Sequence, residues 1–425
     1  MPSVATIILA AGEGTRMRSG VPKVLHELCG RPMLDYVVEF VTTLRCRPVV
    51  AVIGAGARDV RARLPRGWRT VQQMVRRGTG HAVRLALQHL TPRVPSVLIV
   101  YGDQPLVTTA TVQRLLETHR TSGARCTILT AVVADPQHYG RIVRDGDRLL
   151  KIVEETDATP TERALQEVNI GVAVFQREAL LTALRHVTPT NRQHEYYLTD
   201  AITWLAEDTA GTVYAYRTDD ATEALGVNSR ADLAAAARVL RRRIALHWME
   251  RGVTIVDPET TYLAANVSIG EDTTIFPCTV IEREVRIGRR CTIGPFARVR
   301  SGSRLADGVR LGNFTETVRS RLGARTRMQH FSYIGDATVG ADVNVGAGTI
   351  TANYDGLAKH PTRIGTRAFV GSGTVVVAPA SIGERAVTGA GCVITRGTRV
   401  RRGTTVVGVP ARELRSSAAP RKRRR

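Results

Sequence analysis

Short apolar runs alternate with amphipathic segments along the first 228 residues of the chain. Strands that alternate with helices predict an α/β domain whose Rossmann-like, mostly parallel sheet is covered on both faces. Ligands of such sheets bind at the carboxyl ends of the strands. The expected strands are Ala5–Leu9, Val49–Ile53, Val97–Val100, Cys126–Val133 and Val172–Phe175, and the helical segments between them are Met33–Leu44, His81–His89 and Ala110–His119.

A period of six replaces this pattern from Ile269 onward. Aliphatic residues keep an unbroken spacing of six as far as Leu311, and further runs cover 322–345 and 364–406, where Thr388 is the exception. A period of six is neither helical nor a strand alternation. It fits one side of a triangular solenoid with about eighteen residues per coil. Glycine follows many of these positions and relieves the backbone at the corners. The pattern therefore predicts a parallel β-helix of hexapeptide repeats.

Two stretches, 312–321 and 351–363, do not keep the period. We expect them to be loops that project from the solenoid, where functional residues are often found.

A helix is expected to join the two halves. Ser229 and Asp232 form a capping pair at its start, and Ala-rich turns continue to Trp248. The predicted domains are an α/β domain at 1–228, a linker helix at 229–252, the β-helix at 253–411 and a basic, disordered tail at 412–425.

The net charge of +22 is unevenly distributed. Residues 1–228 carry 27 basic and 23 acidic side chains, whereas 229–411 carry 26 and 14 and the last fourteen residues carry 7 and 1. Lysine is nearly absent, so a compositional preference for arginine is one explanation. Attraction of anionic substrates such as nucleotides and coenzyme A is another. Nucleic-acid binding is not expected, because no recognition motif accompanies the charge.

The remaining composition favours a cytoplasmic protein. No apolar run approaches the roughly eighteen residues that span a bilayer, so membrane insertion is not expected. The apolar stretch Ile7–Ala11 has no basic segment before it and is predicted to be a strand, not a signal peptide. The six cysteines are scattered without a Cys-x-x-Cys pair, which is typical of reduced thiols in a cytosol.

A glycine-rich turn follows the first expected strand. Gly12 and Gly14 allow backbone N–H groups to approach a phosphate, and the N-terminus of a following helix would favour the phosphate charge. Met17 stands where a dinucleotide-binding motif has its third glycine, so the turn alone is equally compatible with a strand–helix connection without a ligand. Lys23, which follows Pro22, adds a cation near the same strand end.

This arrangement resembles the sugar-phosphate nucleotidylyltransferases, whose Leu-Ala-Ala-Gly-x-Gly-Thr-Arg-Met…Pro-Lys signature is present as 9–17 and 22–23. Further segments occur in the order seen in the bacterial bifunctional N-acetylglucosamine-1-phosphate uridylyltransferase/glucosamine-1-phosphate N-acetyltransferases, and this resemblance covers nearly the whole chain. The matching segments are Gly78–Ala82, Tyr101–Asp103, Tyr139–Ile142, Val153–Glu154, Glu167–Asn169, Glu195–Asp200 and Gly226–Asn228.

The resemblance implies two activities and a left-handed β-helix. The enzyme would acetylate glucosamine-1-phosphate with acetyl-CoA and then transfer UMP from UTP to N-acetylglucosamine-1-phosphate, releasing pyrophosphate. In one alternative the chain is a nucleotidylyltransferase only, and the β-helix is an oligomerisation or regulatory module. In another it is a basic binding protein without enzymatic activity.

Nucleotidyl transfer is an in-line displacement, in which positioning and charge neutralisation carry most of the catalysis. Asp103 and Asn228 offer hard oxygen ligands to one Mg²⁺. The resemblance implies that Arg16 and Lys23 hold the phosphates. The implied nucleotide-binding residues are Leu9, Ala10, Ala11, Gly12, Lys23, Gln73, Gly78, Thr79, Tyr101, Gly102 and Asp103, with Gln73, Thr79 and the backbone of 10–11 at the uracil. The implied sugar-phosphate residues are Gly140, Glu154, Asn169 and Asn228.

Two positions depart from the family in this half. Arg76 stands where a second glutamine is usual, and Ile170 stands where a threonine commonly follows the asparagine.

Polar residues cluster near the interruptions of the solenoid. Transfer of an acetyl group to an amine requires a base, and histidine is suited to this near neutral pH. His330, within Gln329–Tyr333, matches the catalytic base of the family. The resemblance implies sugar-phosphate binding by Arg300, Tyr333 and Asn344, and acetyl-CoA binding by Ala347, Asn353, Tyr354, Lys359, Ser372 and Ala390.

The family forms these acetyl sites between the subunits of a trimer, so a homotrimer is implied. One departure lies at the acetyl site, because the phosphate-binding lysine of the family is Val318 here. Arg319 or Arg321 would be the replacement for that cation.

Overall fold

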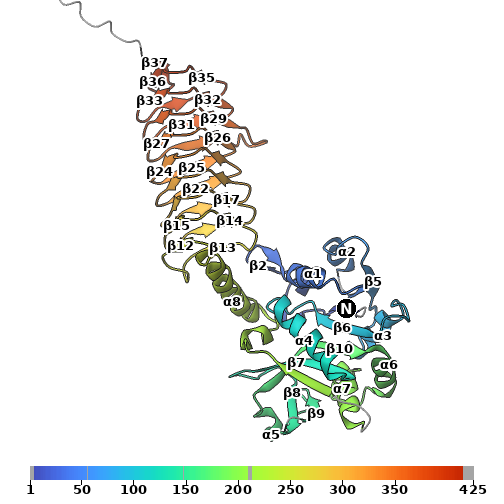
Figure 1. Ribbon diagram of the computed structural model, residues 1–425. Coiled ribbons are helices and arrows are strands. Elements are labelled where there is room, and N and C mark those ends of the chain that lie inside the picture. Colours follow the sequence, from blue (N-terminus) through green and yellow to red (C-terminus); the bar gives the residue numbers. More distant parts are fainter. Residues whose placement is uncertain (1–3, 55, 147, 209–212, 415–425) are drawn as a thin grey trace, which may run out of the picture. The chain divides into compact units, whose positions relative to one another are not determined.

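The computed structural model describes residues 4–54, 56–146, 148–208 and 213–414, and the chain divides into two compact units between residues 239 and 240 (Figure 1). The first unit is built on a nine-stranded sheet. Its main path runs in the order β11-β7-β10-β6-β1-β4-β5. These strands are β1 (Val4–Ala10), β4 (Val49–Ile53), β5 (Arg69–Gln72), β6 (Ser96–Tyr101), β7 (Cys126–Val132), β10 (Glu167–Gln176) and β11 (Val213–Arg217).

The predicted mostly parallel sheet is confirmed along its main path, where β10 is the one antiparallel strand. β1 pairs in parallel with β4 and β6, whereas β10 runs antiparallel between β6 and β7. A hairpin of β8 (Arg141–Asp145) and β9 (Arg148–Val153) extends from β10. Strands β5, β8, β9 and β11 were not expected from the sequence, because they lie at the margins of the sheet and mix apolar with charged or polar residues.

Helices cover both faces of the sheet, as expected. Successive residues of a strand point to opposite faces, and Ile7 and Ile8 of β1 accordingly belong to two different cores. One core contains side chains from α3 (Thr79–Leu87), α6 (Arg177–His186) and α7 (Leu198–Glu207). The other contains side chains from α1 (Met33–Leu44), α2 (Ala57–Ala62) and α4 (Thr109–Ser122). A short helix, α5 (Pro160–Arg163), begins with a capping box.

The helix expected after the glycine-rich turn is absent from this described segment. Thr15–Met17 form a single 3-10 turn, η1, followed by a second turn, η2 (Lys23–Leu25). An isolated 3-10 turn has no aligned macrodipole of the kind that a long helix directs at a phosphate. Charge at this strand end therefore comes mainly from side chains.

α8 (Arg230–Met249) spans the boundary between the two units. The expected capping pair is present: Asp232 N donates to Ser229 Oγ at 3.2 Å, and Ser229 N donates to Asp232 Oδ2 at 2.8 Å.

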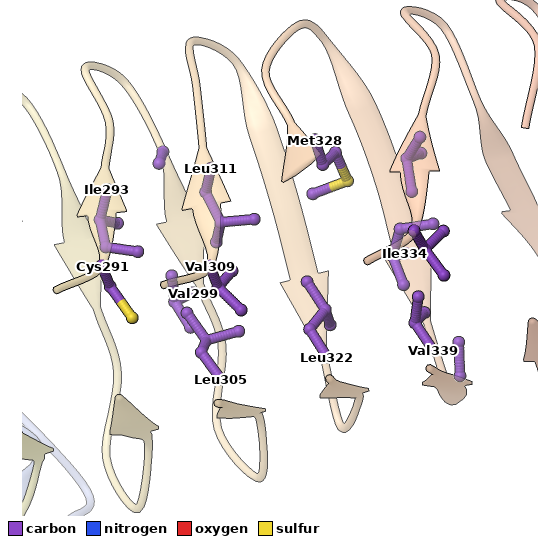
Figure 2. Packing of buried hydrophobic residues seen from close by; sticks show 14 of the residues in the cluster. Cys291, Ile293, Val299, Leu305, Val309, Leu311, Leu322, Met328, Ile334 and Val339 are labelled. Carbon is purple, nitrogen blue, oxygen red and sulfur yellow. The ribbon is translucent and has the colours of Figure 1, made fainter. Parts of the chain in front are cut away.

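The second unit is a left-handed parallel β-helix with three sheets. The first runs from β12 (Thr254–Ile255) to β37 (Arg412–Glu413), the second from β13 (Tyr262–Leu263) to β34 (Val393–Ile394), and the third from β14 (Ser268–Ile269) to β35 (Arg399–Val400). The aliphatic residue of each repeat points inward and stacks on its equivalent in the next coil, as Ile275 does on Ile293. Figure 2 shows these inward side chains between Cys291 and Val339.

The prediction of a projecting loop at 312–321 is wrong. β22 (Thr315–Val318) is a regular strand of the second sheet, and Thr317 occupies the inward position between Val299 and Ile334. Leu305 pairs with Leu322, so this coil has seventeen residues instead of eighteen. The buried, β-branched side chain of Thr317 takes the inward position that an aliphatic residue such as valine occupies in other coils. The coil is shortened by one residue at a corner.

The second interruption does project, over a narrower range than predicted. β28 (Ile350–Ala352) and β29 (Thr362–Ile364) are coil strands, and residues 353–361 lie between them. Val339 pairs with Ile364, so the loop adds seven residues to a coil of eighteen. Thr388 keeps its inward position, where its hydroxyl accepts from Gly371 N at 3.0 Å.

The last described residues correct the expected tail. Arg412 and Glu413 form β37, which pairs antiparallel with β36 (Thr405–Val407). Residues 415–425 of the expected tail lie outside the described residues. Of the helices that are described, none has the length and hydrophobicity that a membrane crossing requires.

Two candidate active sites

The carboxyl ends of β1 and β6 form the floor of a cavity of about 320 Å³. Gly102 N donates to the carbonyl of Leu9 at 2.9 Å and so joins the two strand ends. All of the expected nucleotide residues except Gly102 line this cavity. The sequence analysis did not assign five further residues of the lining, which are Glu13, Val24, Arg76, Ala82 and Glu195.

A cation stands between the two expected metal ligands. The ammonium of Lys23, a residue only 9% exposed, forms an ion pair with Asp103 and donates to Asn228 Oδ1 at 3.0 Å. Val227 N donates to the carbonyl of Asp103 at 3.0 Å, which brings Asn228 beside it. Gly14, at φ 66°, permits this approach, because a Cβ there would lie 2.7 Å from Lys23 Cβ.

This donor set fits Mg²⁺. Two hard oxygens, one of them charged, converge on one cationic position, and Mg²⁺ usually takes one or two carboxylates and completes its shell with phosphate oxygens and water. No group of three or more His, Cys, Asp or Glu side chains suited to a metal occurs within the described ranges.

Arg16 and Arg76 are placed differently from each other. Arg16 lies in η1 with an exposed side chain and is not among the residues that line the cavity. Arg76 lines the cavity and forms an ion pair with Glu13 of the glycine-rich turn. Arg76, at the position of the departure, therefore links two loops that border this cavity.

Gln73 and Thr79 are held by hydrogen bonds at the edge of the cavity. Gln73 Nε2 donates to the carbonyl of Gly78 at 3.1 Å and lies 3.1 Å from His81 Nδ1. Thr79 Oγ1 accepts from Leu198 N at 2.9 Å and shares a hydrogen bond with Tyr101, whose pKa is raised chiefly by burial.

The expected sugar residues converge next to this cavity wall. Asn169 N donates to the carbonyl of Gly140 at 2.9 Å, and a Cβ on Gly140 would lie 3.5 Å from both carboxylate oxygens of Glu154. Burial raises the pKa of Glu154, although Thr199 Oγ1 donates to its carboxylate at 3.1 Å. Ile170 is fully buried in the core, so the departure at this position changes the packing of β10 and not the polar groups at the sugar site.

Acidic residues surround Glu154. Burial raises the pKa of Asp200 to about 6, and the nearby charge of Asp157 acts in the same direction. Asp200 and Asp157 also contribute to the raised pKa of Glu154.

In the β-helix, the expected coenzyme residues Ala347, Ser372 and Ala390 follow one corner of successive coils. Gly348 N donates to the carbonyl of Phe331 at 2.8 Å, Gly373 N to Ala347 at 2.7 Å and Gly391 N to Ser372 at 2.8 Å. These bonds place Ala347, Ser372 and Ala390 in one column, which begins beside the exposed His330.

Two of the three expected sugar-phosphate residues, Arg300 and Tyr333, follow the second sheet. Arg300 N donates to the carbonyl of Thr317 at 2.7 Å, and Val318 pairs with Gly335, so Val318 lies in register between Arg300 and Gly335. A Cβ on Gly335 would lie 2.5 Å from Tyr333 Oη and 2.7 Å from Asn353 Nδ2. Arg300, Tyr333 and Asn353 therefore share one edge, whereas Asn344 lies in β27 (Asn344–Val345) of the first sheet.

The cations near Val318 are not equivalent. Arg319 donates two hydrogen bonds to Asp336, at 2.6 and 2.7 Å, so its charge already has a partner. Arg319, Arg321, Lys359 and Asp336 all line a hollow of about 310 Å³.

The projecting loop is fixed at its base. His360 Nε2 lies 2.6 Å from Asp355 Oδ2, and the exposed Tyr354 forms an isolated bridge with Lys359.

Comparison with known proteins matches both halves of the chain. A model of the MobA-like NTP transferase domain matches residues 6–194, and a model of the bacterial transferase hexapeptide (six repeats) matches 266–301 and 361–396. A protein of Geobacillus thermodenitrificans named "Bifunctional protein GlmU" is 43% identical, over 96% of this chain and 94% of its own length. Proteins of the same name from Shouchella clausii and Heliobacterium modesticaldum are each 42% identical, over 88% of this chain and 89% of their own lengths.

A solved UDP-glucose pyrophosphorylase in complex with UDP-glucose aligns with 57% of this chain and 99% of its own, at a TM-score of 0.48 and 16% identity.

Proposed function

Because the chain belongs to the family of bifunctional GlmU proteins, we propose that the two sites described above carry its two reactions. The chain is a bifunctional enzyme of UDP-N-acetylglucosamine synthesis, a UTP-dependent uridylyltransferase and an acetyl-CoA-dependent N-acetyltransferase. The alternative with nucleotidyl transfer alone does not account for relatives that match both halves.

The cavity above β1 and β6 is the proposed uridylyl site. The phosphate oxygen of N-acetylglucosamine-1-phosphate attacks the α-phosphorus of UTP in line, and the bond to pyrophosphate breaks. Lys23 neutralises phosphate charge, and Asp103 with Asn228 would hold the Mg²⁺, which neutralises further charge on the phosphates when bound. Lys23 and Asp103 line one cavity, and Asn228 contacts the same ammonium of Lys23; this convergence is the observation that carries the assignment.

The sugar and the base are assigned to different groups of residues, and both groups contact the start of α7 through Thr199 and Leu198. Gly140, Glu154 and Asn169 offer a carboxylate, an amide and backbone groups to the hydroxyl and acetamido groups of the sugar. Gln73 and Thr79, with the backbone of 10–11, are assigned to the uracil. Arg16 is exposed and does not line the cavity, and we assign it a secondary role in holding the triphosphate.

The edge around His330 is the proposed acetyl site. His330 takes a proton from the amine of glucosamine-1-phosphate as the amine attacks the acetyl carbonyl, and the thiolate of coenzyme A leaves. The column of Ala347, Ser372 and Ala390 supplies backbone groups and space for the coenzyme. Arg300, whose guanidinium donates to Glu316 at 2.8 Å, is assigned with Tyr333 to the sugar phosphate.

A homotrimer would complete the acetyl site. Asn344 lies on a different sheet from Arg300 and Tyr333, and the side chains of Asn344 and Lys359 are available to a neighbouring copy. The corner next to His330 also exposes Phe296, Phe314 and Phe331, the last two at 62%, and contiguous exposed apolar side chains mark an association surface. We further place the enzyme in the cytoplasm, where UTP and acetyl-CoA are available.

One incubation tests both proposed reactions. The protein is mixed with acetyl-CoA, glucosamine-1-phosphate, UTP and Mg²⁺, and the products are identified by mass. We expect N-acetylglucosamine-1-phosphate and UDP-N-acetylglucosamine. Omission of acetyl-CoA should abolish the acetylated products, and this deficit should be overcome by added N-acetylglucosamine-1-phosphate.

A further inference from the structure

The side-chain amide of Gln73 has a defined orientation. One of its ends lies 3.1 Å from the carbonyl oxygen of Gly78, which only accepts hydrogen bonds, so this end is the NH₂ group. The same NH₂ group lies 3.1 Å from His81 Nδ1. Gln73 is 7% exposed, and it lines the nucleotide cavity. With its nitrogen engaged twice, Gln73 offers its carbonyl oxygen to a ligand.

The contact with Gln73 also determines the protonation state and the tautomer of His81. An NH₂ group donates, so Nδ1 must accept, which requires a neutral ring with its proton on Nε2. The pKa of His81 is lowered by burial, and then by the positive charges of Arg77 and Arg84. Arg84 is itself held in place, since its guanidinium donates to the carbonyl of Val187 at 3.2 Å and lies over the ring of Tyr196.

The orientation of the Gln73 amide determines which pyrimidine base can form a hydrogen bond with it. Uracil carries a hydrogen-bond donor at N3, whereas cytosine carries an acceptor there. A fixed carbonyl oxygen pairs with the first and repels the second, and sites built on such hydrogen bonds discriminate strongly.

We propose that His81 is a positioning residue for base selection, which holds Gln73 with its carbonyl oxygen towards the pyrimidine and so favours UTP over CTP. The proposal rests on the assignment of Gln73 to the uracil. His81 itself need not touch the nucleotide.

The test compares kcat/KM for UTP and CTP, with N-acetylglucosamine-1-phosphate as acceptor and full-length protein. His81→Leu removes the acceptor, and we expect the UTP/CTP ratio to fall about tenfold, the effect of one hydrogen bond of roughly 1.4 kcal/mol. His81→Asn places an amide oxygen near the position of Nδ1 and should keep the ratio within about twofold of the wild type. The thermal unfolding transition that UTP shifts checks that the first unit of each variant is folded, because acetyl transfer reports only on the second unit.

The pH dependence separates positioning from a packing effect. In the wild type, the ratio should fall as the pH drops below the pKa of His81, which lies under its usual 6.5, because a protonated Nδ1 cannot accept. In His81→Asn, which does not titrate there, the ratio should stay constant. A ratio with the same pH dependence in both proteins would overturn the proposal.

Gln73→Leu distinguishes failure of this inference from failure of the site assignment. The UTP/CTP ratio of kcat/KM should fall strongly in Gln73→Leu. Adding His81→Leu to this variant should cause no further loss, as expected of two groups that act as one. A normal ratio in Gln73→Leu refutes the assignment of Gln73 to the uracil. A collapsed ratio in Gln73→Leu together with an unchanged one in His81→Leu refutes the role of His81 alone.

Discussion

Lys23 and Asp103 form an ion pair at the carboxyl end of β6, although 80 residues separate them in sequence. Both side chains are largely shielded from water, with 11% and 19% of their surfaces exposed. Asn228 adds a third contact to the same ammonium. We infer that the phosphates of UTP replace these oxygens as partners of Lys23, and that Asp103 and Asn228 then become available to Mg²⁺.

Asp103→Asn should reduce UDP-sugar formation about a hundredfold or more, because it removes the only charged side chain of the proposed metal site. Acetyl transfer should be unaffected. The measurement is the rate of pyrophosphate release at several Mg²⁺ concentrations. Asp59→Asn, in α2, serves as the matched control, and equal loss of both activities in Asp103→Asn would contradict two independent sites.

UTP should be preferred over dTTP, CTP and ATP in steady-state competition, despite the departure at Arg76. The ion pair of Arg76 with Glu13 is partly exposed, and such pairs contribute about 0–1 kcal/mol. Arg76→Gln should therefore change the KM for UTP by less than about fivefold. A preference for another nucleotide that reverts to UTP in Arg76→Gln would show that this departure alters base selection.

Asp200→Asn should stabilise the first unit at pH 8. The folded-state pKa of about 6 lies above the usual 3.8, so the favourable contribution of protonated Asp200 is complete below pH 4 and is lost as the pH rises through 6. We expect the free energy of unfolding to rise by about 1 kcal/mol at pH 8, less than a shift of this size would give for a fully buried group, because the carboxyl remains partly exposed. Calorimetry at pH 4 and 8 measures the difference, in the transition that UTP shifts. An equal gain in the stability of the first unit at pH 4 and pH 8 would contradict this explanation.

His330→Ala should abolish most of the acetyl transfer and leave uridylyl transfer intact. No other side chain in the column beside Phe331 is suited to accept the proton of the amine. The rate of coenzyme A release measures the effect, and His247→Ala, at an exposed position of α8, provides a histidine control away from the proposed site. Full activity in His330→Ala would remove this residue from the mechanism.

Val318→Lys should lower the KM for glucosamine-1-phosphate several-fold and change kcat little, because it adds a ground-state phosphate contact. The position lies in register between Arg300 and Gly335, next to the hydroxyl of Tyr333. Arg319 is held by Asp336, so its charge is not a free substitute. An unchanged KM in Val318→Lys, combined with a raised KM in Arg321→Gln, would assign the phosphate to Arg321.

The coils of the second unit could be predicted from the spacing of its apolar residues, whereas the path of residues 312–321 was decided by packing. The spacing of six predicted the coils, since each aliphatic residue must face the same narrow interior. The broken spacing at 312–321 misled, because a threonine in the inward position does not look apolar in sequence. Only pairing with Val299 and Ile334 shows that Thr317 belongs to the core.

The sequence by itself determined the two architectures and the capped helix at their boundary, since periodicity and local motifs act over a few residues. It also predicted most of the residues that line the proposed nucleotide cavity. The tertiary structure alone decided which distant groups meet. Lys23 and Asn228 are 205 residues apart, and Arg76 and Glu13 are 63 apart, so neither contact leaves a local signal. The state of His81 was likewise decided by folding, because the protonation of a histidine depends on the partner, burial and charges that the folded chain places around it.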